Sequence, residues 1–179
     1  MNKIICTITS LILALGIGTA EAAESIYYKH SLGASAGKGK PHSLSGFRFH
    51  YRNTPIQCSW FEFGLEASYA RWNVKYFTNN RLEVFALAPV IRANLFSFGQ
   101  EQFFLEGSVG PAKRSTKQLA DRRAGSKWTF QDIIGFGFTV LRQKLDFRIQ
   151  YTHYSNANLA RPNPGTEVIP MLTLSYRFN

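Results

Sequence analysis

Hydrophobic and polar residues alternate along much of this chain, which is the pattern of β-strands that have one apolar face. In the segment 145–155, apolar side chains occupy the odd positions and charged or polar side chains occupy the even positions. The segments 46–52 and 60–71 repeat this alternation, with aromatic residues on one parity against Arg, His or Glu on the other. The segment 128–140 follows it too, apart from Asp132 on its apolar side. The pattern predicts a chain that is built of amphipathic strands.

Extending this interpretation along the chain gives eight strand segments. They are 26–37, 43–52, 57–73, 82–96, 101–111, 126–141, 144–156 and 167–178, most of them long enough to cross a bilayer when tilted. The predicted connections are tight turns at 52–55, 97–99 and 142–143 and longer loops at 37–42, 74–81, 112–125 and 157–166. Short turns at one end and longer loops at the other are typical of outer-membrane barrels. We therefore expect an all-β fold, an eight-stranded antiparallel transmembrane β-barrel.

Aromatic residues make up 15% of the chain, and several fall near the predicted strand ends. As interfacial girdles we assign Trp72 and Trp128 to the long-loop end and Trp60, Tyr51 and Tyr176 to the short-turn end. The same residues could instead fill the core of a soluble sandwich or a lipocalin-like barrel. The last strand favours the membrane, because its apolar row continues almost to the chain end.

Two features concern the strand interiors. The segment 82–96 is apolar on both parities and contains Pro89, which cannot donate to a strand ladder, so that a bulge is one way to accommodate it. On the polar parities, opposite charges are expected to pair inside a barrel that is narrow enough to be filled by side chains. The residues concerned are Glu62, Glu66, Glu106, Arg48 and Arg148.

The N-terminus is expected to be a signal peptide. Lys3 is followed by the uncharged apolar run from Ile4 to Ile17 and by the small-x-small sequence Ala20-Glu21-Ala22. The apolar run is shorter than the roughly 20 residues of a transmembrane helix. We expect residues 1–22 to be removed on export and residues 23–179 to form one barrel domain in the outer membrane of a Gram-negative cell.

The formal net charge is +10 at pH 7, and basic residues gather in the predicted long loops, above all between Pro111 and Lys127. Positive loops on the external side would attract the phosphates of lipopolysaccharide, although such a run is also common in plain solvated loops. No nucleic-acid partner is expected, because the sequence has no groove-entering helix or binding-module motif. The histidines show no metal-ligand spacing, so we expect neither metal nor cofactor.

Two polar residues, His153 and Ser155, end the apolar row of the segment 145–155. Residues two apart on a strand project to the same side with Cα atoms roughly 6.5 Å apart, so that imidazole and hydroxyl can meet. A carboxylate from the next strand, such as Glu167, would complete the nucleophile, base and orienting group of a serine hydrolase. Spacing alone favours a simpler interpretation, in which the strand end emerges among lipid head groups. A hydrolase that acts on a lipid, however, would need these groups on the lipid-facing side.

A longer motif surrounds these residues. His153-Tyr154-Ser155-Asn156-Ala157 is followed by Pro162-Asn163-Pro164-Gly165 and by Glu167. This run resembles the signature of the lipid A 3-O-deacylase family of the PagL type. The similarity is sharpest over 145–170 and rests elsewhere on the signal peptide, the length and the eight-strand pattern. It implies an eight-stranded outer-membrane barrel that removes the acyl chain ester-linked at position 3 of lipid A.

The resemblance also implies roles for individual residues. His153, Ser155 and Glu167 match the family's catalytic triad in order and spacing. The supporting positions are Asn156, Ala157, Asn158 and Asn163. Among these, Asn163 matches a position associated with the oxyanion, and backbone N–H groups near Ala157 are further donors. The family often has Gly where this chain has Asn158.

Glu167 conflicts with the alternation of the last strand. An apolar row runs along the even positions, which turns Glu167 inward and away from His153; its members are Val168, Pro170, Leu172 and Leu174. An irregularity near Pro170, such as a β-bulge, would re-aim one side chain and bring the carboxylate to the outer face. We therefore expect a bulge at the start of this strand.

Taken together, the sequence predicts an outer-membrane esterase that takes lipid A or lipopolysaccharide as its substrate and deacylates lipid A at position 3. Two other functions stay open. One is a non-catalytic small barrel that binds lipopolysaccharide or another surface through its basic loops, and the other is a different lipid-modifying barrel, such as an acyltransferase. A homodimer is also compatible with the sequence.

Overall fold

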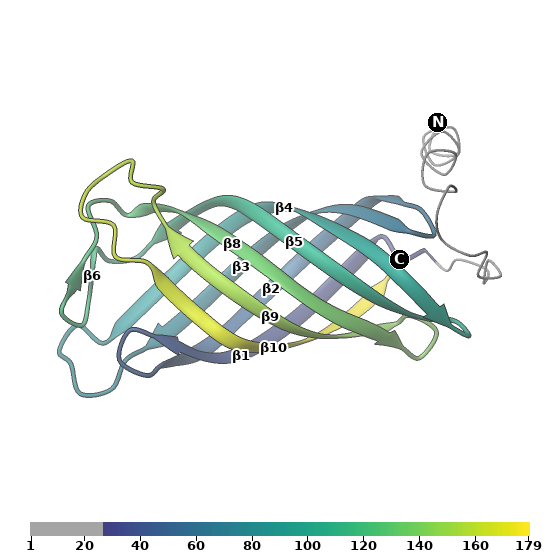
Figure 1. The fold of residues 1–179 in the computed structure, drawn as a ribbon, viewed down its shortest axis with the longest axis horizontal. Coiled ribbons are helices and arrows are strands. Elements are labelled where there is room, and N and C mark those ends of the chain that lie inside the picture. Colours follow the sequence, from purple (N-terminus) through teal and green to yellow (C-terminus); the bar gives the residue numbers. More distant parts are fainter. Residues whose placement is uncertain (1–26) are drawn as a thin grey trace.

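The computed structural model describes residues 27–179, which form one closed antiparallel barrel (Figure 1). The wall consists of β1 (His30–Lys40), β2 (Leu44–Gln57), β3 (Phe61–Asn73), β4 (Arg81–Phe98), β5 (Glu101–Arg114), β8 (Trp128–Val140), β9 (Leu145–Ser155) and β10 (Thr166–Phe178). β10 pairs with β1 and closes the wall. The predicted eight-stranded antiparallel transmembrane barrel is confirmed. The predicted signal peptide, residues 1–22, lies outside the described residues.

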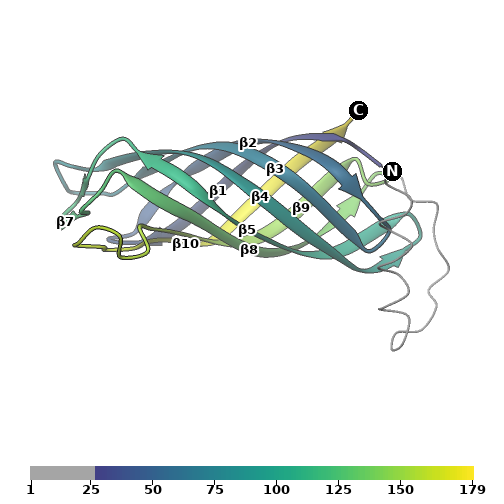
Figure 2. The ribbon, with the colours of Figure 1, turned by 90° about the horizontal axis from the view of Figure 1, so that it is seen from above.

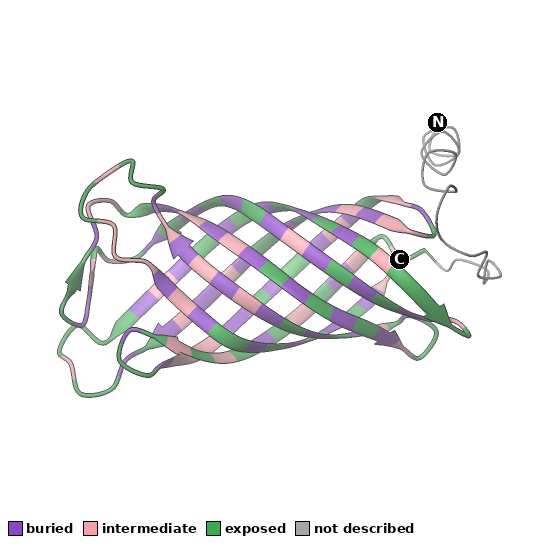
Figure 3. Ribbon diagram, viewed as in Figure 1, coloured by how far each residue is buried: buried purple, intermediate pink, exposed green. Residues whose placement is uncertain are grey.

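Burial alternates along the strands of the wall, so that the ribbon in Figure 3 is banded. On β9 the even positions from Asp146 to Tyr154 are buried, and the odd positions lie on the outer wall. The outer wall carries a belt of exposed large apolar side chains, among them Leu32, Phe49, Phe85, Ile91, Ile134, Phe136 and Leu172. So extensive a belt is suited to hydrocarbon rather than to water. The alternative of a soluble sandwich or a lipocalin-like barrel is therefore wrong.

The barrel has two different ends, which we call the turn end and the loop end. The C-terminus and the tight turns lie at the turn end, and the longer connections lie at the loop end (Figures 1 and 2). Within the connection from β5 to β8, β6 (Gln118–Leu119) and β7 (Arg122–Arg123) form a small hairpin where the sequence predicted only a loop. No helix among residues 27–179 is long and apolar enough to span a bilayer.

One predicted turn is wrong. β2 continues through 52–55 to Gln57, and the turn to β3 follows at 58–60. The pairing of β2 with β3 shifts register between Asn53 and Ile56. Pro55 lies inside this irregularity, where a residue without an N–H interrupts no ladder hydrogen bond. Asn-Thr-Pro is a turn signal in sequence, but here it marks a bulge.

Three of the five predicted girdle residues are exposed as expected, and Trp60, in the turn before β3, is partly buried. Trp128 is exposed on the outer wall at the loop end, and Tyr51 and Tyr176 are exposed near the turn end. Trp72, in contrast, is fully buried inside the barrel. It shares the inward parity of Ala70 on β3, so that strand alternation overrides the usual interfacial preference of Trp.

The interior near the loop end is filled by what we call the apolar core. Its members include Leu44, Ala70, Trp72, Val74, Leu82, Val84, Leu119, Tyr154, Val168 and Met171. β4 contributes Leu82 and Val84 to this core while Phe85 faces outward, which explains why the segment 82–96 is apolar on both parities. The bulge suggested at Pro89 is not formed, because pairing with β5 is interrupted there but resumes in the same register.

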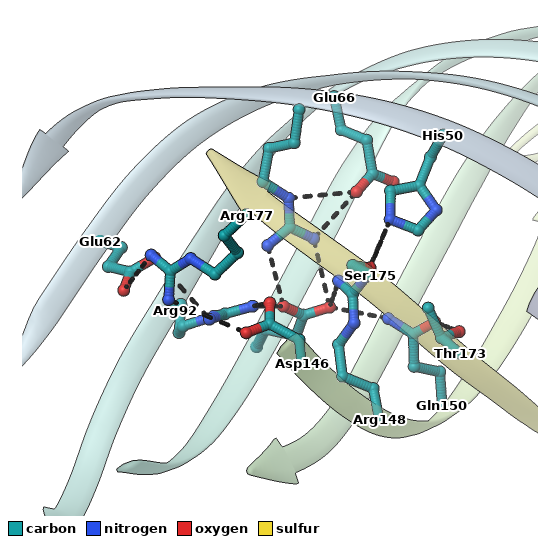
Figure 4. Close-up of polar contacts among 12 residues, drawn as sticks. His50, Glu62, Glu66, Arg92, Asp146, Arg148, Gln150, Thr173, Ser175 and Arg177 are labelled. Carbon is teal, nitrogen blue, oxygen red and sulfur yellow. Dashed lines mark hydrogen bonds and ion pairs between the residues drawn. The ribbon is translucent and has the colours of Figure 1, made fainter. Parts of the chain in front are cut away.

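The interior toward the turn end is filled by what we call the charged network (Figure 4). At its centre Glu106 accepts hydrogen bonds from Arg52 (3.0 Å), Arg148 (2.8 Å) and Gln150 (2.7 Å). The other charged members are Arg48, Glu62, Glu66, Arg92, Asp146 and Arg177, and His50 joins the network by accepting a hydrogen bond from Arg148 at Nε2. The predicted pairing of charges inside the barrel is confirmed.

Candidate active site

The candidate site lies on three neighbouring strands near the loop end. His153 on β9 lies directly opposite Glu167 on β10 and directly opposite Asp132 on β8. All three side chains are partly exposed, and the chain neighbours of each are buried, so that they share the outer wall. Opposed residues on one face have Cβ atoms roughly 4.5–5.5 Å apart. An imidazole is thus flanked by a carboxylate on each side, on a surface that faces lipid.

A β-bulge turns Glu167 to the outer wall. The pairing of β10 with β9 shifts register between Val168 and Met171. Both of these side chains face the apolar core, while Pro170 and its predecessor are exposed between them. Proline suits a bulge because it has no N–H to contribute to the ladder. The irregularity expected near Pro170 is confirmed, and it resolves the parity conflict.

The polar neighbours of the His153 imidazole gather at Nδ1, one of its two nitrogens. Its Nδ1 lies 4.0 Å from Oε1 of Glu167 and 3.4 Å from the hydroxyl of Tyr151. The Tyr151 ring also stacks with the imidazole, with ring centroids 6.3 Å apart. Gly165 lies against the ring as well, since a Cβ atom added there would be 2.6 Å from Cε1 of His153. With a carboxylate and a hydroxyl near Nδ1, Nε2 is the nitrogen left for Ser155.

Ser155 is the last residue of β9, two positions from His153 on the same face. Among the hydrogen bonds of residues 27–179, none joins the Ser155 hydroxyl to the imidazole; the ring nitrogen instead meets Tyr151. Hydrogen bonds of catalytic groups are often long without substrate and shorten when substrate binds. The structure therefore brings His153 and Glu167 to ion-pair distance and leaves Ser155 as their neighbour.

A hydrogen-bonded loop follows Ser155. The N–H of Asn156 donates to Oδ1 of Asn163 (2.9 Å), and Nδ2 of Asn156 donates to the carbonyl of Ala160 (2.6 Å). The Nδ2 of Asn163 lies 3.4 Å from Oδ1 of Asn158. The backbone N–H of Asn156 fixes the side-chain oxygen of Asn163. The side-chain NH₂ group of Asn163 therefore keeps an N–H for a ligand beside Ser155.

The turn in this loop explains the departure from the family pattern. Ala157 has a φ of 51° and Asn158 a φ of 62°, both in the left-handed region. Glycine adopts this region freely, and Asn adopts it more readily than most other residues. Asn158 can therefore stand where the family often has Gly without altering the course of the backbone.

Sequence reasoning missed three residues of the site. Asp132 appeared only as an exception on an apolar row, yet a carboxylate on a lipid-facing strand is costly and thereby signals a partner. Tyr151 looked like one more member of the apolar row. Gly165 belonged to the motif, but its contact with His153 depends on the loop conformation, which alternation does not predict.

These side chains suit proton transfer and nucleophilic attack: a hydroxyl, an imidazole, an orienting carboxylate and amide donors lie together. Within residues 27–179, no three His, Cys, Asp or Glu side chains gather into a metal site. Fold and site together define a class, that of transmembrane barrels with a candidate hydrolase site on the lipid-facing wall.

Comparison with known proteins narrows this class. Residues 42–177 match the family model of lipid A 3-O-deacylase (PagL). The chain belongs to the PagL family.

Two curated relatives are each named lipid A deacylase PagL. The protein from Bordetella bronchiseptica is 38% identical over 78 residues, which cover 44% of this chain and 43% of that protein. The protein from Pseudomonas aeruginosa is 36% identical over 64 residues, which cover 36% of each protein. The matches thus span less than half of either relative.

Two solved structures share the fold. The outer membrane enzyme PagL superposes with a TM-score of 0.64 at 24% identity, covering 82% of this chain and 98% of that chain. Neisserial surface protein A (NspA) superposes with a TM-score of 0.55 at 11% identity, covering 83% of this chain and 96% of that chain. Both likenesses support the small outer-membrane barrel fold.

Proposed function

We propose that this protein hydrolyses the acyl ester at position 3 of lipid A in the outer membrane, with Ser155 as nucleophile, His153 as base and Glu167 as orienting group. One observation carries the proposal: the bulge at Pro170 places Glu167 directly opposite His153 on the outer wall. Membership in the PagL family supports the same reaction and substrate. A lipid ester in the outer leaflet can reach this face without entering the barrel.

The mechanism follows from the arrangement of the imidazole. Nε2 of His153 takes the proton of the Ser155 hydroxyl as the oxygen attacks the ester carbonyl. Glu167, near Nδ1, orients the ring and stabilises its protonated form. The imidazolium then protonates the departing sugar oxygen, which leaves an acyl group on Ser155. Water, deprotonated by the same imidazole, attacks this acyl group and releases the fatty acid.

The oxyanion formed during each attack needs hydrogen-bond donors. The Nδ2 group of Asn163 and the backbone N–H groups of Ala157 and Asn158 lie in the loop directly after Ser155. Losing one such donor typically lowers kcat by about 10²–10³-fold. Asn163→Ala should reproduce a loss of this size, whereas Asn163→Asp would in addition place a negative charge beside the oxyanion.

The basic loops contribute to substrate attraction. Lys113, Arg122, Arg123 and Arg161 are all at the loop end, where the phosphates of lipopolysaccharide lie if this end faces outward. Exposed cations speed the encounter with a negative surface more than they change the chemical step. Arg122→Ala should therefore weaken surface binding more than intrinsic ester hydrolysis.

The test uses the full mature chain, refolded in detergent and incubated with lipid A, with products identified by mass. Loss of one hydroxyacyl chain with the wild type, and not with Ser155→Ala or His153→Ala, supports the proposal. Unchanged lipid with an intact barrel would contradict it and favour a lipopolysaccharide binder, and a mass gain would favour an acyltransferase. The N-terminal sequence of exported protein tests the removal of residues 1–22.

A further inference from the structure

A small pocket lies beside Ser155 on the side of β8. Its volume is about 190 Å³, and its lining includes Trp128, Phe130, Asn156 and Leu159. Phe130 is the direct cross-strand partner of Ser155, and Asn156 follows Ser155 in the chain. A group held in this pocket therefore lies next to the nucleophile. The pocket is smaller than the roughly 300–1,000 Å³ clefts that hold drug-sized ligands, which suits a single ring.

One buried atom in the pocket wall has an unmet hydrogen-bonding need. Asn156 is 5% exposed, and its Nδ2 is held by the carbonyl of Ala160 at 2.6 Å. Its Oδ1 is buried and has no hydrogen-bond partner among residues 27–179. A buried acceptor without a donor is costly. The wall thus favours a ligand that offers an O–H or N–H group over a bare alkyl chain.

Trp128 offers an aromatic face at the pocket, and a cation from the neighbouring strand β5 stands over its ring. Trp128 is 63% exposed, and Nζ of Lys113 lies 5.6 Å from the centre of its ring. An exposed indole face packs against the C–H face of a sugar ring, and an adjacent ammonium attracts a phosphate.

The pocket has a defined shape because two loops meet above it. The N–H of Gly125 donates to the carbonyl of Pro162 at 2.7 Å. A Cβ atom at Gly125 would be 2.5 Å from the carbonyl oxygen of Arg161, so the two backbones touch. The loop that carries Asn156 is therefore tied to the loop that leads into Trp128.

We infer that this pocket binds the acylated, phosphate-bearing glucosamine ring of the substrate. The ring stacks on Trp128, an amide N–H or hydroxyl of the sugar donates to Oδ1 of Asn156, and Lys113 faces a phosphate. The ester oxygen on the ring then lies beside Ser155, and the acyl chain runs down the apolar outer wall. This inference rests on the proposed function and assigns Trp128 to substrate selection.

The experiment compares two substrates on the refolded full chain: lipid A and 4-nitrophenyl decanoate, an ester without a sugar. The measured quantity is the ratio of kcat/KM for lipid A to kcat/KM for the nitrophenyl ester. Trp128→Ala should lower this ratio about tenfold, and Trp128→Phe, which keeps an aromatic face, should lower it less. Trp60→Ala, at the turn end, is the matched control and should leave the ratio unchanged.

Two results would overturn the inference. One is an unchanged ratio in Trp128→Ala. The other is a Trp128→Ala protein whose kcat/KM depends on acyl-chain length differently from that of the wild type in a series of nitrophenyl esters. That result would assign the pocket to the acyl chain. If the wild type cleaves no lipid A, the proposed reaction fails by itself. Lipid A binding to Ser155→Ala, with and without Trp128→Ala, then decides the pocket: about tenfold weaker binding supports it, and equal binding contradicts it.

Discussion

The two halves of the barrel interior hold the same wall in different ways. Toward the turn end, the charged network fills the barrel with paired side chains, and Glu106 alone meets Arg52, Arg92 and Arg148. Toward the loop end, the apolar core fills it with side chains such as Met171 that have no charged partner to lose. The candidate site lies on the outer wall over the apolar half.

Because of this difference, the apolar core supports the candidate site, whereas the charged network stabilises the barrel wall. Tyr154 lies between His153 and Ser155 in the chain and points into the apolar core, as does Val168 behind Glu167. The site is therefore supported from behind by packing, which imposes no charge near the imidazole. The charged network is farther along the barrel and contributes to the wall as a whole. Variants in the two halves should thus have different consequences.

The largest effect is expected at the site itself. Ser155→Ala should lower kcat for lipid A by on the order of 10⁴-fold or more, because the nucleophile is gone, while thermal unfolding in detergent stays unchanged. Ser45→Ala, a serine near the same end of the barrel, is the matched control and should retain activity. A Ser155→Ala protein that still deacylates lipid A would contradict the assignment of Ser155 as the nucleophile.

The next largest effect is expected from a mutation at the centre of the charged network, and it concerns stability. Glu106→Ala leaves three buried arginines short of a partner, and such a loss typically costs about 3–5 kcal/mol. The unfolding temperature should fall strongly, whereas kcat measured well below that temperature should stay near the wild-type value. Glu106→Gln, which keeps some hydrogen bonds, should be milder. Loss of activity without loss of stability would show that the halves are not separate.

A cavity in the apolar half should affect both properties. Met171→Ala removes a fully buried side chain directly behind the bulge, at a cost of at least about 2 kcal/mol. Stability should fall, and kcat should fall with it because the bulge that aims Glu167 loses its support. Met171→Leu, which conserves volume, is the control for equilibrium unfolding and kinetics. A fall in stability with kcat preserved would argue against support from behind.

A smaller change should act on chemistry alone. Gly165→Ala places a methyl group against the His153 ring and should displace it, which lowers kcat about tenfold with little change in KM or in unfolding. As a positioning residue, Gly165 should also alter the pH profile of kcat. Gly99→Ala is the control: a Cβ atom there would touch nothing, although the φ of 61° strains any residue other than glycine. This variant therefore reports the effect of a methyl group on a turn far from the site.

The smallest effect concerns the loops. Nε2 of His42 lies 2.7 Å from Oδ1 of Asp121, and this hydrogen bond lowers the pKa of the Asp121 carboxyl below its usual value. A carboxyl with a lowered pKa stabilises the folded loops at neutral pH, and the contribution is lost as pH falls through that pKa. His42→Ala should raise the pKa of Asp121 toward its usual value, as read by NMR titration. An unmoved titration would exclude the contact.

Much of the architecture could be predicted because alternation depends only on which face of a strand meets lipid. It identified the eight strands and the outward row that ends in His153 and Ser155. Alternation fails where register shifts. Pro55 was assigned to a turn but lies inside a bulge of β2, whereas the bulge at Pro170 was expected because Glu167 conflicted with the alternation. Trp72 was misplaced because residue preference was weighed above parity.

Other parts of the site depend on long-range contacts that no local pattern contains. The pairing of Asp132 with His153 becomes visible only once β8 and β9 are in register. The unpartnered oxygen of Asn156 and the contact of Gly165 with the imidazole depend on the loop after β9. The charged network, in contrast, was foreseen, because buried charges must pair wherever the barrel closes.

The most direct test is covalent labelling in outer-membrane vesicles with a fluorophosphonate that carries a long alkyl chain. Attack by an activated serine on phosphorus expels fluoride and leaves a stable phosphonyl ester, which peptide mass spectrometry can locate. We expect a single labelled peptide that contains Ser155, with labelling lost in His153→Ala and reduced in Glu167→Gln. Labelling at another residue, or equal labelling without His153, would contradict an outward-facing triad.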